Sequence, residues 1–114
     1  SRSSLNRESS GKKEYVLIRK RTGEIFALTS DGNRIGRHPK NEVPIVGNTS
    51  IGRLHCYIFF QEENGVKSCF IEDNHSANRT LLNGFQLPEG HAYLLMDGDT
   101  ILLADEEFLF RMIE

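Results

Sequence analysis

The chain has 114 residues, 38% of them apolar and 26% charged, with a formal net charge of −2. This length and composition suit one globular domain rather than a disordered chain. No apolar run approaches the ~18 residues of a membrane span, and a nucleic-acid-binding domain is usually strongly basic, so we expect neither a membrane nor a direct nucleic-acid partner.

The first 13 residues, SRSSLNRESSGKK, contain a single large apolar residue, Leu5. Such a segment cannot bury enough surface to offset the entropy lost on ordering. We therefore predict a flexible N-terminal segment over residues 1–13 and one folded domain over residues 14–114.

From residue 14 onward, short apolar runs alternate with turn residues, and no window carries a helical period of 3.6. Strand-like runs that recur every 8–12 residues are typical of a β-sandwich or barrel. Pro44 lacks an N–H donor, which confines its strand to a sheet edge or a strand end. The pattern predicts strands at 15–18, 24–28, 43–46, 54–60, 66–72, 79–82, 92–96, 100–104 and 108–113, with turns at 22–23, 30–33 and 62–65.

The two cysteines, Cys56 and Cys69, lie inside apolar runs and form no CxxC pair. We expect them to be small buried residues, and without a disulfide framework the default setting is a reducing cytosol or nucleus. The four histidines lack the spacing of metal ligands, so no metal or cofactor is expected. Asp97-Gly98-Asp99 lacks the other positions of a calcium loop and is typical of a turn between strands.

His55 begins the strongest predicted strand, and neither Ser50 nor Ser68 lies in a G-x-S-x-G motif. The histidine therefore indicates a structural role rather than a catalytic one. An enzyme that pairs His55 with a nearby Ser or Cys is an alternative function, as is nucleic-acid binding through the basic run Arg19, Lys20 and Arg21.

Other basic residues lie in predicted loops or at strand ends. Each one alone is typical of a solvated surface charge. If the fold brings them together, however, their guanidinium groups can bind an oxyanion with paired hydrogen bonds. These residues are Arg34, Arg37, His38, Lys40, Arg53 and Arg79.

Four segments occur in a fixed order: IGR at 35–37, IGRLH at 51–55, SANRTLLNG at 76–84 and LMDGDTI at 95–101. Together they resemble the forkhead-associated (FHA) domain pattern of G-R, S-x-x-H, S-x-N-G-T-x-x-N-G and L-x-x-G-D-x-I. The resemblance covers the predicted folded part. It implies an all-β, two-sheet sandwich of about eleven strands, whose loops at one end bind a phosphothreonine peptide.

The resemblance also implies roles for individual residues. Arg37 corresponds to the arginine that contacts the peptide or phosphate, Arg53 lies beside the phosphate, and Asn78 bonds to the peptide backbone. A phosphate of about −1.5 to −2 charge suits such arginine and amide donors held on loops. The loop-supporting positions of the family correspond to Gly36, His55, Asn83 and Gly84.

The sequence departs from the family pattern at three binding positions. Gly52 stands where the family has its phosphate-binding Ser, and Ala77 stands where a Thr or Ser is common. Arg79 replaces the Gly after the Asn and adds a positive charge. Ser50 and Thr49, just upstream of Gly52, are the alternative hydroxyl donors.

The stretches around Ser50-Ile51 and at 101–105 are similar to the N-terminal FHA domains of DNA-damage checkpoint mediators. This likeness implies a nuclear, non-enzymatic interaction module that docks protein partners through its loops, forms a homodimer through a sandwich face, or does both. The alternative is a conventional phosphothreonine reader. An apolar set is either an exposed dimer face or simply core: Tyr15, Leu17, Phe108, Phe110 and Met112.

Overall fold

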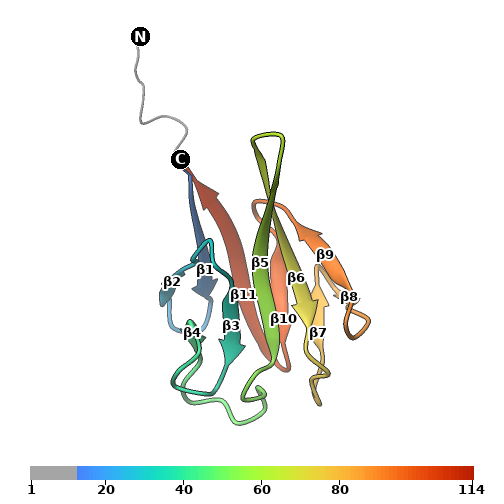
Figure 1. Ribbon diagram of the computed structural model, residues 1–114. Coiled ribbons are helices and arrows are strands. Elements are labelled where there is room, and N and C mark those ends of the chain that lie inside the picture. Colours follow the sequence, from blue (N-terminus) through green and yellow to red (C-terminus); the bar gives the residue numbers. More distant parts are fainter. Residues whose placement is uncertain (1–12) are drawn as a thin grey trace.

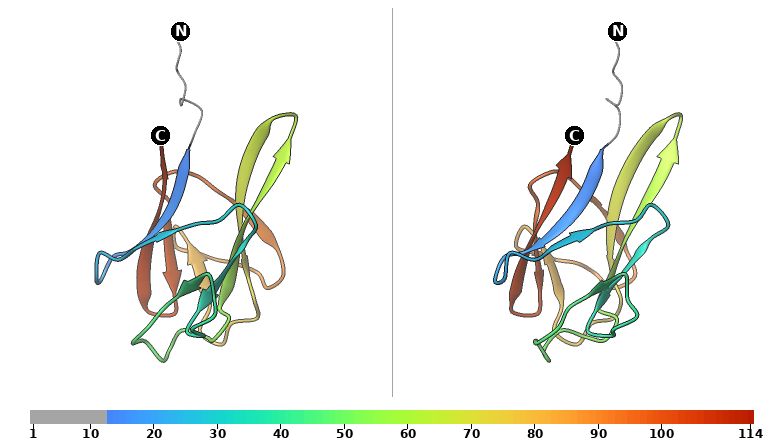
Figure 2. Two further views of the ribbon diagram at one scale, coloured as in Figure 1. Left: turned by 60° about the vertical axis from the view of Figure 1, so that its left-hand side comes forward. Right: turned by 90° about the vertical axis from the view of Figure 1, so that its left-hand side faces the viewer.

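Eleven strands and no helix make up the part of the chain that the computed structural model describes, residues 13–114. The strands form two sheets that pack face to face (Figures 1 and 2), which confirms the predicted all-β sandwich. The predicted flexible segment lies, apart from Lys13, outside the described residues. The strands are β1 (Glu14–Arg19), β2 (Ile25–Ala27), β3 (Asn33–Gly36), β4 (Val43–Pro44), β5 (Cys56–Glu63), β6 (Val66–Asp73), β7 (Thr80–Leu82), β8 (Phe85–Gln86), β9 (Ala92–Leu95), β10 (Thr100–Leu103) and β11 (Glu106–Ile113).

One sheet has six strands in the order β2-β1-β11-β10-β7-β8, and the other has five in the order β4-β3-β5-β6-β9. The paired strands run antiparallel, except that β3 and β4 are parallel. Strand β4 contains Pro44 and lies at a sheet edge, as the missing N–H predicts. No helix in the described part is long and apolar enough to cross a membrane.

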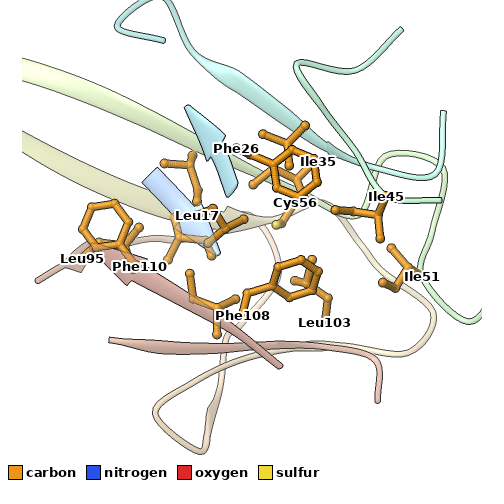
Figure 3. Close-up of a cluster of buried hydrophobic side chains, with 14 of the residues drawn as sticks. Leu17, Phe26, Ile35, Ile45, Ile51, Cys56, Leu95, Leu103, Phe108 and Phe110 are labelled. Atoms are coloured by element: carbon orange, nitrogen blue, oxygen red, sulfur yellow. The ribbon is translucent and has the colours of Figure 1, made fainter. Parts of the chain in front are cut away.

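The core fills the space between the two sheets (Figure 3). Strand β1 pairs with β11 so that Leu17 lies opposite Phe110, and both side chains point inward with Phe108. All three are fully buried, whereas Tyr15 and Met112 are half-buried and pack against the same cluster. Of the two alternatives for this apolar set, the core is therefore correct for Leu17, Phe108 and Phe110. Burial of each large side chain contributes about 1.5–3 kcal/mol.

The pattern missed two strands, β3 and β8. We predicted Asn33 in a turn, but it begins β3, because its side chain forms hydrogen bonds to the neighbouring backbone. Its Oδ1 accepts a hydrogen bond from the backbone N–H of Thr29 at 2.8 Å, and its Nδ2 donates to the carbonyl of Ile58 at 3.0 Å. A residue type that usually marks a turn thus joins β3 to β5.

The two cysteine thiols are buried and unoxidised, as predicted. Burial raises the pKa of the Cys69 thiol to about 12 and raises that of Cys56 further still. Neither thiol forms a thiolate near neutral pH, so neither is a nucleophile. Among the described residues no group of three or more His, Cys, Asp or Glu is placed to hold a metal ion.

A charged cluster lies where β1 ends and β11 begins, two neighbouring strands inside the six-stranded sheet. The guanidinium of Arg19 donates two hydrogen bonds to the carboxylate of Glu106, and both side chains are about 95% buried. Arg21 donates to the same carboxylate at 2.7 Å, and Lys20 pairs with Glu107 at 3.9 Å. Each cation of the run 19–21 thus has a carboxylate partner, although the side chains of Lys20 and Arg21 are about half exposed.

Candidate functional site

Three loops meet at the end of the sandwich opposite the chain termini (Figures 1 and 2). They are the β3–β4 loop, the β4–β5 loop and the β6–β7 loop. The first two touch through their backbones. Arg37 N–H donates to the carbonyl of Gly52 at 2.9 Å, and His38 N–H donates to that of Arg53 at 3.2 Å.

This close contact depends on the glycine at the end of β3. A Cβ on Gly36 would lie 2.3 Å from the carbonyl oxygen of Arg53 and 2.5 Å from that of Gly52. No side chain fits at that separation, since the neighbouring atoms are backbone. Glycine at 36 therefore sets how near Arg37 lies to the β4–β5 loop.

The side chain of Arg37 is held in place from one side. Its Nε donates to the carbonyl of Ile51, a buried residue of the β4–β5 loop. The terminal N–H groups make no other hydrogen bond within residues 13–114. The guanidinium is thus oriented by the fold and keeps donors for a ligand.

His55 links the β4–β5 loop to the β6–β7 loop. Its Nδ1 accepts a hydrogen bond from Gly52 N–H at 2.9 Å, so the neutral ring carries its proton on Nε2 and donates to the carbonyl of Arg79 at 2.8 Å. The ring is fully buried, and desolvation lowers its pKa. With both nitrogens bonded to backbone, His55 supports the loops and is not placed to act as a general base.

Asn78 and Asn48 hold the β4–β5 loop from two further sides. Asn78 Nδ2 donates to the carbonyl of Ser50 at 2.8 Å. Asn48 accepts from Ser50 N–H at 2.9 Å and donates to Glu106 at 3.0 Å. The loop is therefore joined both to the β6–β7 loop and to the charged cluster of the other sheet.

The described residues include seven arginines, and the carboxylates divide them into two groups. Arg19, Arg21, Arg34 and Arg111 each pair with a carboxylate at hydrogen-bond distance. Within residues 13–114, no carboxylate lies within 4.0 Å of the basic groups of the other three. Those three are Arg37, Arg53 and Arg79, which all belong to the loop end.

A family model described as the FHA domain matches residues 33–104, more than half of the chain. The chain belongs to the FHA family. FHA domains are interaction modules rather than enzymes. The sequence matches none of the curated proteins with which it was compared.

Several solved structures share the fold of this chain. Full-length yeast Pml1p superposes with a TM-score of 0.80 at 24% identity, covering 93% of this chain and 86% of that one. The MEK1 FHA domain in complex with a phosphothreonine peptide of HOP1 gives 0.76 at 24%, covering 88% and 97%. Mycobacterium tuberculosis EmbR, in complex with a low-affinity phosphopeptide, gives 0.74 at 26%, covering 88% of this chain and 24% of that one.

In this FHA domain the departures from the family pattern lie on the surface of the loop end. Gly52 is half-buried, and a Cβ there would lie 3.6 Å from His55 Nδ1, an ordinary contact distance. Ala77, Thr49 and Ser50 are exposed. The fold thus has room for the missing hydroxyls at 52 and 77.

Two hydroxyls of the β6–β7 segment bond to the protein itself instead. The side chains of Ser76 and Thr80 both donate to Oδ1 of the buried Asp73, Thr80 at 2.6 Å. The sequence analysis did not identify Asp73 as a residue that shapes this loop. Because both hydroxyls are bonded to it, they shape the loop rather than face a ligand.

The Asn83-Gly84 turn joins β7 to β8. Both residues have positive φ, 49° and 86°, the geometry that a two-residue hairpin needs. The side chain of Asn83 donates to Asp99 at 3.0 Å and accepts from Thr100 N–H at 2.9 Å. The turn is thereby fixed to the Asp97-Gly98-Asp99 segment, which is a turn before β10, as predicted.

Arg79 adopts a left-handed backbone conformation, with φ of 73°. The FHA pattern has glycine here, and a residue with a Cβ pays about 1–2 kcal/mol in this region. The conformation directs the carbonyl of Arg79 to His55. The loop therefore holds an arginine in a backbone geometry that favours glycine.

We expect Arg79→Gly to stabilise the domain by about 0.5–1 kcal/mol, because relief of the left-handed strain exceeds the added freedom of glycine in the unfolded chain. Urea unfolding of the two proteins measures this difference. Arg79→Ala is the matched control, since it removes the same exposed side chain but keeps the strain. Equal stability of the glycine and alanine variants would contradict the prediction.

Proposed function

We propose that this FHA domain docks partner proteins through a phosphothreonine held between Arg37 and Arg53. The observation that carries the proposal is the division of the arginines. Those at the loop end have no carboxylate partner within the described residues, whereas the other four are neutralised. Unpaired guanidinium groups bind a dianionic phosphate with strong, charge-assisted hydrogen bonds, and that of Arg37 is already oriented by its bond to Ile51. The phosphopeptide complexes of the MEK1 domain and EmbR support the proposal.

Each remaining group has a defined part in the proposed complex. Arg37 donates its terminal N–H groups to phosphate oxygens, while its Nε keeps the bond to Ile51. Arg53 is exposed and adds charge from the adjacent loop. Asn78 presents its amide to the peptide backbone, next to Ser50, whose carbonyl it already contacts.

The same geometry argues for weak binding. A hydrogen bond to a charged group contributes about 1.5–3 kcal/mol, and Gly52 and Ala77 supply no hydroxyl. Arg79 is exposed at the same loop and adds a third positive charge. We therefore infer a reader whose affinity depends mainly on charge and falls steeply as salt rises.

We expect Arg37→Ala to reduce affinity for a phosphothreonine peptide at least 10-fold, because the oriented cation is lost. Isothermal titration with the phosphorylated and unphosphorylated forms of one peptide measures this effect. Arg111→Ala is the control, since its guanidinium pairs with Asp97 on exposed surface. Equal binding of the two variants would refute the proposed role of Arg37. No saturable binding to the wild-type domain at millimolar peptide would refute the reader itself.

A nuclear DNA-damage role and homodimerisation stay predictions that rest on the checkpoint-mediator likeness. A dimer has to use a surface other than Leu17, Phe108 and Phe110, because these side chains are fully buried. Sedimentation equilibrium tests the dimer, and a strict monomer at high concentration would contradict it.

A further inference from the structure

The outer face of the five-stranded sheet, which is turned toward the viewer in Figure 1, carries apolar side chains where β5, β6 and β9 pair. Phe59 lies opposite Phe70, which in turn lies opposite Leu94. The rings of Phe59 and Phe70 are stacked with their centroids 5.7 Å apart, and Leu94 is 49% exposed. These three residues form an apolar ridge across three strands.

This apolar ridge departs from the usual pattern of an antiparallel sheet with one solvated face. In such a sheet the side chains that alternate with the buried ones are polar. Ile58, Ile71 and Leu95 are buried in the core, so their neighbours in the ridge occupy positions at which polar residues are expected. A contiguous apolar patch, unlike a scattered single residue, indicates an interaction surface.

A hollow of about 460 Å³ lies beside the ridge and shares Phe59 with it. Tyr57 of β5 lies between Arg34 of β3 and Glu72 of β6 in the register of the sheet. The hollow therefore crosses three strands, as the ridge does. Its lining combines two aromatic rings with four charged groups, namely Tyr57, Phe59, Asp31, Arg34, Glu42 and Glu72.

The charged groups of this acidic hollow leave an excess of negative charge. Arg34 is neutralised by Glu42, to which it donates hydrogen bonds of 3.0 and 2.9 Å, and these bonds hold the pKa of Glu42 at about 2. Asp31 and Glu72 form no ion pair with any residue of 13–114. Two carboxylates therefore line the acidic hollow without a basic partner.

The backbone that carries these two carboxylates is held in place before any ligand arrives. Asp31 lies in a turn that Asn33 closes: Asn33 Oδ1 accepts from Thr29 N–H at 2.8 Å, and its Nδ2 donates to the carbonyl of Thr29 at 3.0 Å. Glu72 lies in β6, which pairs with β5 on one side and β9 on the other. Little ordering of the backbone is therefore needed to bind a cation.

We propose that this face of the sheet docks an unphosphorylated partner segment, which inserts an arginine into the acidic hollow and lays an apolar residue along the ridge. The occupant follows from charge complementarity. A guanidinium pairs with Asp31 and Glu72 through charge-assisted hydrogen bonds and stacks on the rings of Tyr57 and Phe59. A second copy of the domain fits less well, because face-to-face packing would bring two negatively charged hollows together.

This docking surface is independent of the proposed phosphothreonine site. The unpaired charged groups of the loop end are cations, whereas those of the acidic hollow are anions. A phosphorylated segment is therefore repelled from the hollow, and a basic segment is repelled from the loop end. The domain thus has two surfaces that select partner segments of opposite charge.

The probe is a library of unphosphorylated peptides of about 12 residues displayed on phage and selected on the wild-type domain. We expect the enriched peptides to combine an arginine with a nearby apolar residue. Each is then synthesised with Arg, Lys or citrulline at that position and titrated by fluorescence anisotropy. Citrulline, which keeps the shape but not the charge, is expected to bind about 10-fold more weakly than Arg, and Lys about 3-fold, since an ammonium lacks the planar fork.

Two variants locate the binding surface. Glu72→Gln is expected to weaken binding of the arginine peptide about 5-fold and to leave that of the citrulline peptide within about 2-fold. Phe59→Thr, which keeps a residue suited to a strand, is expected to weaken both peptides. Glu107→Gln is the matched control, because it removes an equal charge from the six-stranded sheet. Thermal unfolding checks that each variant folds.

The outcomes decide for or against the docking surface whether or not the domain reads phosphothreonine. Selection that enriches no arginine-containing peptide overturns it. Equal effects of Glu72→Gln and Glu107→Gln also overturn it, since binding then depends only on total charge. Sedimentation equilibrium tests the other occupant: a wild-type dimer that Phe59→Thr converts to a monomer assigns the face to a second copy and overturns the proposal.

Discussion

Gly52→Ser is expected to raise the affinity for a phosphothreonine peptide about 10- to 100-fold. The new hydroxyl adds a hydrogen bond to a charged group, which contributes about 1.5–3 kcal/mol, and every 1.4 kcal/mol is a factor of ten. The backbone accepts a side chain here, because the nearest atom to a Cβ is His55 Nδ1 at 3.6 Å. Ala77→Thr, at an exposed position, is expected to add a further gain in the double variant.

Isothermal titration against one phosphopeptide measures the series of variants. Gly52→Ala is the matched control, since it adds the same Cβ without the hydroxyl, and it is expected to leave affinity unchanged. If Gly52→Ser gives no gain while Ser50→Ala weakens binding, Ser50 already supplies the hydroxyl and the expectation fails.

Glu106→Gln is expected to destabilise the domain by about 3–5 kcal/mol, the cost of leaving a buried charge unpaired. Arg19 is buried against this carboxylate. The amide group of a glutamine would place N–H donors where the guanidinium of Arg19 now finds a negatively charged acceptor. Asn48 donates to the same carboxylate as well as to Asp105, so the bond that joins the β4–β5 loop to the cluster is expected to weaken. Urea unfolding at neutral pH measures the change, and a loss below 1 kcal/mol would refute the stabilising role of the cluster.

The acid dependence of stability is a second readout of the same carboxylate. Hydrogen bonds from Arg19 are the main cause that lowers the pKa of Glu106 from 4.5 to about 2. A carboxyl whose pKa falls on folding stabilises the fold above its unfolded pKa and loses that effect as pH falls. The gap between wild type and Glu106→Gln should therefore be full above pH 4.5 and narrow toward pH 2. Glu107→Gln, an exposed neighbour, should cost less than about 1 kcal/mol at any pH.

Much of the sandwich could be predicted from the spacing of apolar runs. Nine strands follow from local pattern, since their turns carry Gly, Asn or Asp. Strand β3 could not be predicted in this way, because its sequence NRIG contains two turn formers. It exists because Asn33 bonds to β5 and Gly36 allows the β4–β5 loop to approach. Strand β8 has only two residues, too few to form a pattern.

The loop end could be predicted only in part. Short motifs indicate which segments meet there, and the structure brings Arg37, Gly52 and Asn78 to one end through hydrogen bonds between the loops. The pairing of Arg19 with Glu106 could not be predicted from local sequence, since the two residues are 87 positions apart. Lys40 and Arg53 likewise line one hollow only because two loops fold together.

The two ends of the folded domain have a practical consequence for how it is attached. Strands β1 and β11 pair so that Glu14 lies opposite Ile113. The start of β1 and the end of β11 therefore lie at the end of the sandwich far from the β3–β4, β4–β5 and β6–β7 loops (Figure 2). Polypeptide, dye or surface coupled at either end therefore stays clear of an incoming peptide. Several copies tethered side by side through these ends can each keep the three loops accessible. Such an array would bind a multivalent partner with higher apparent affinity, even where each single copy dissociates quickly.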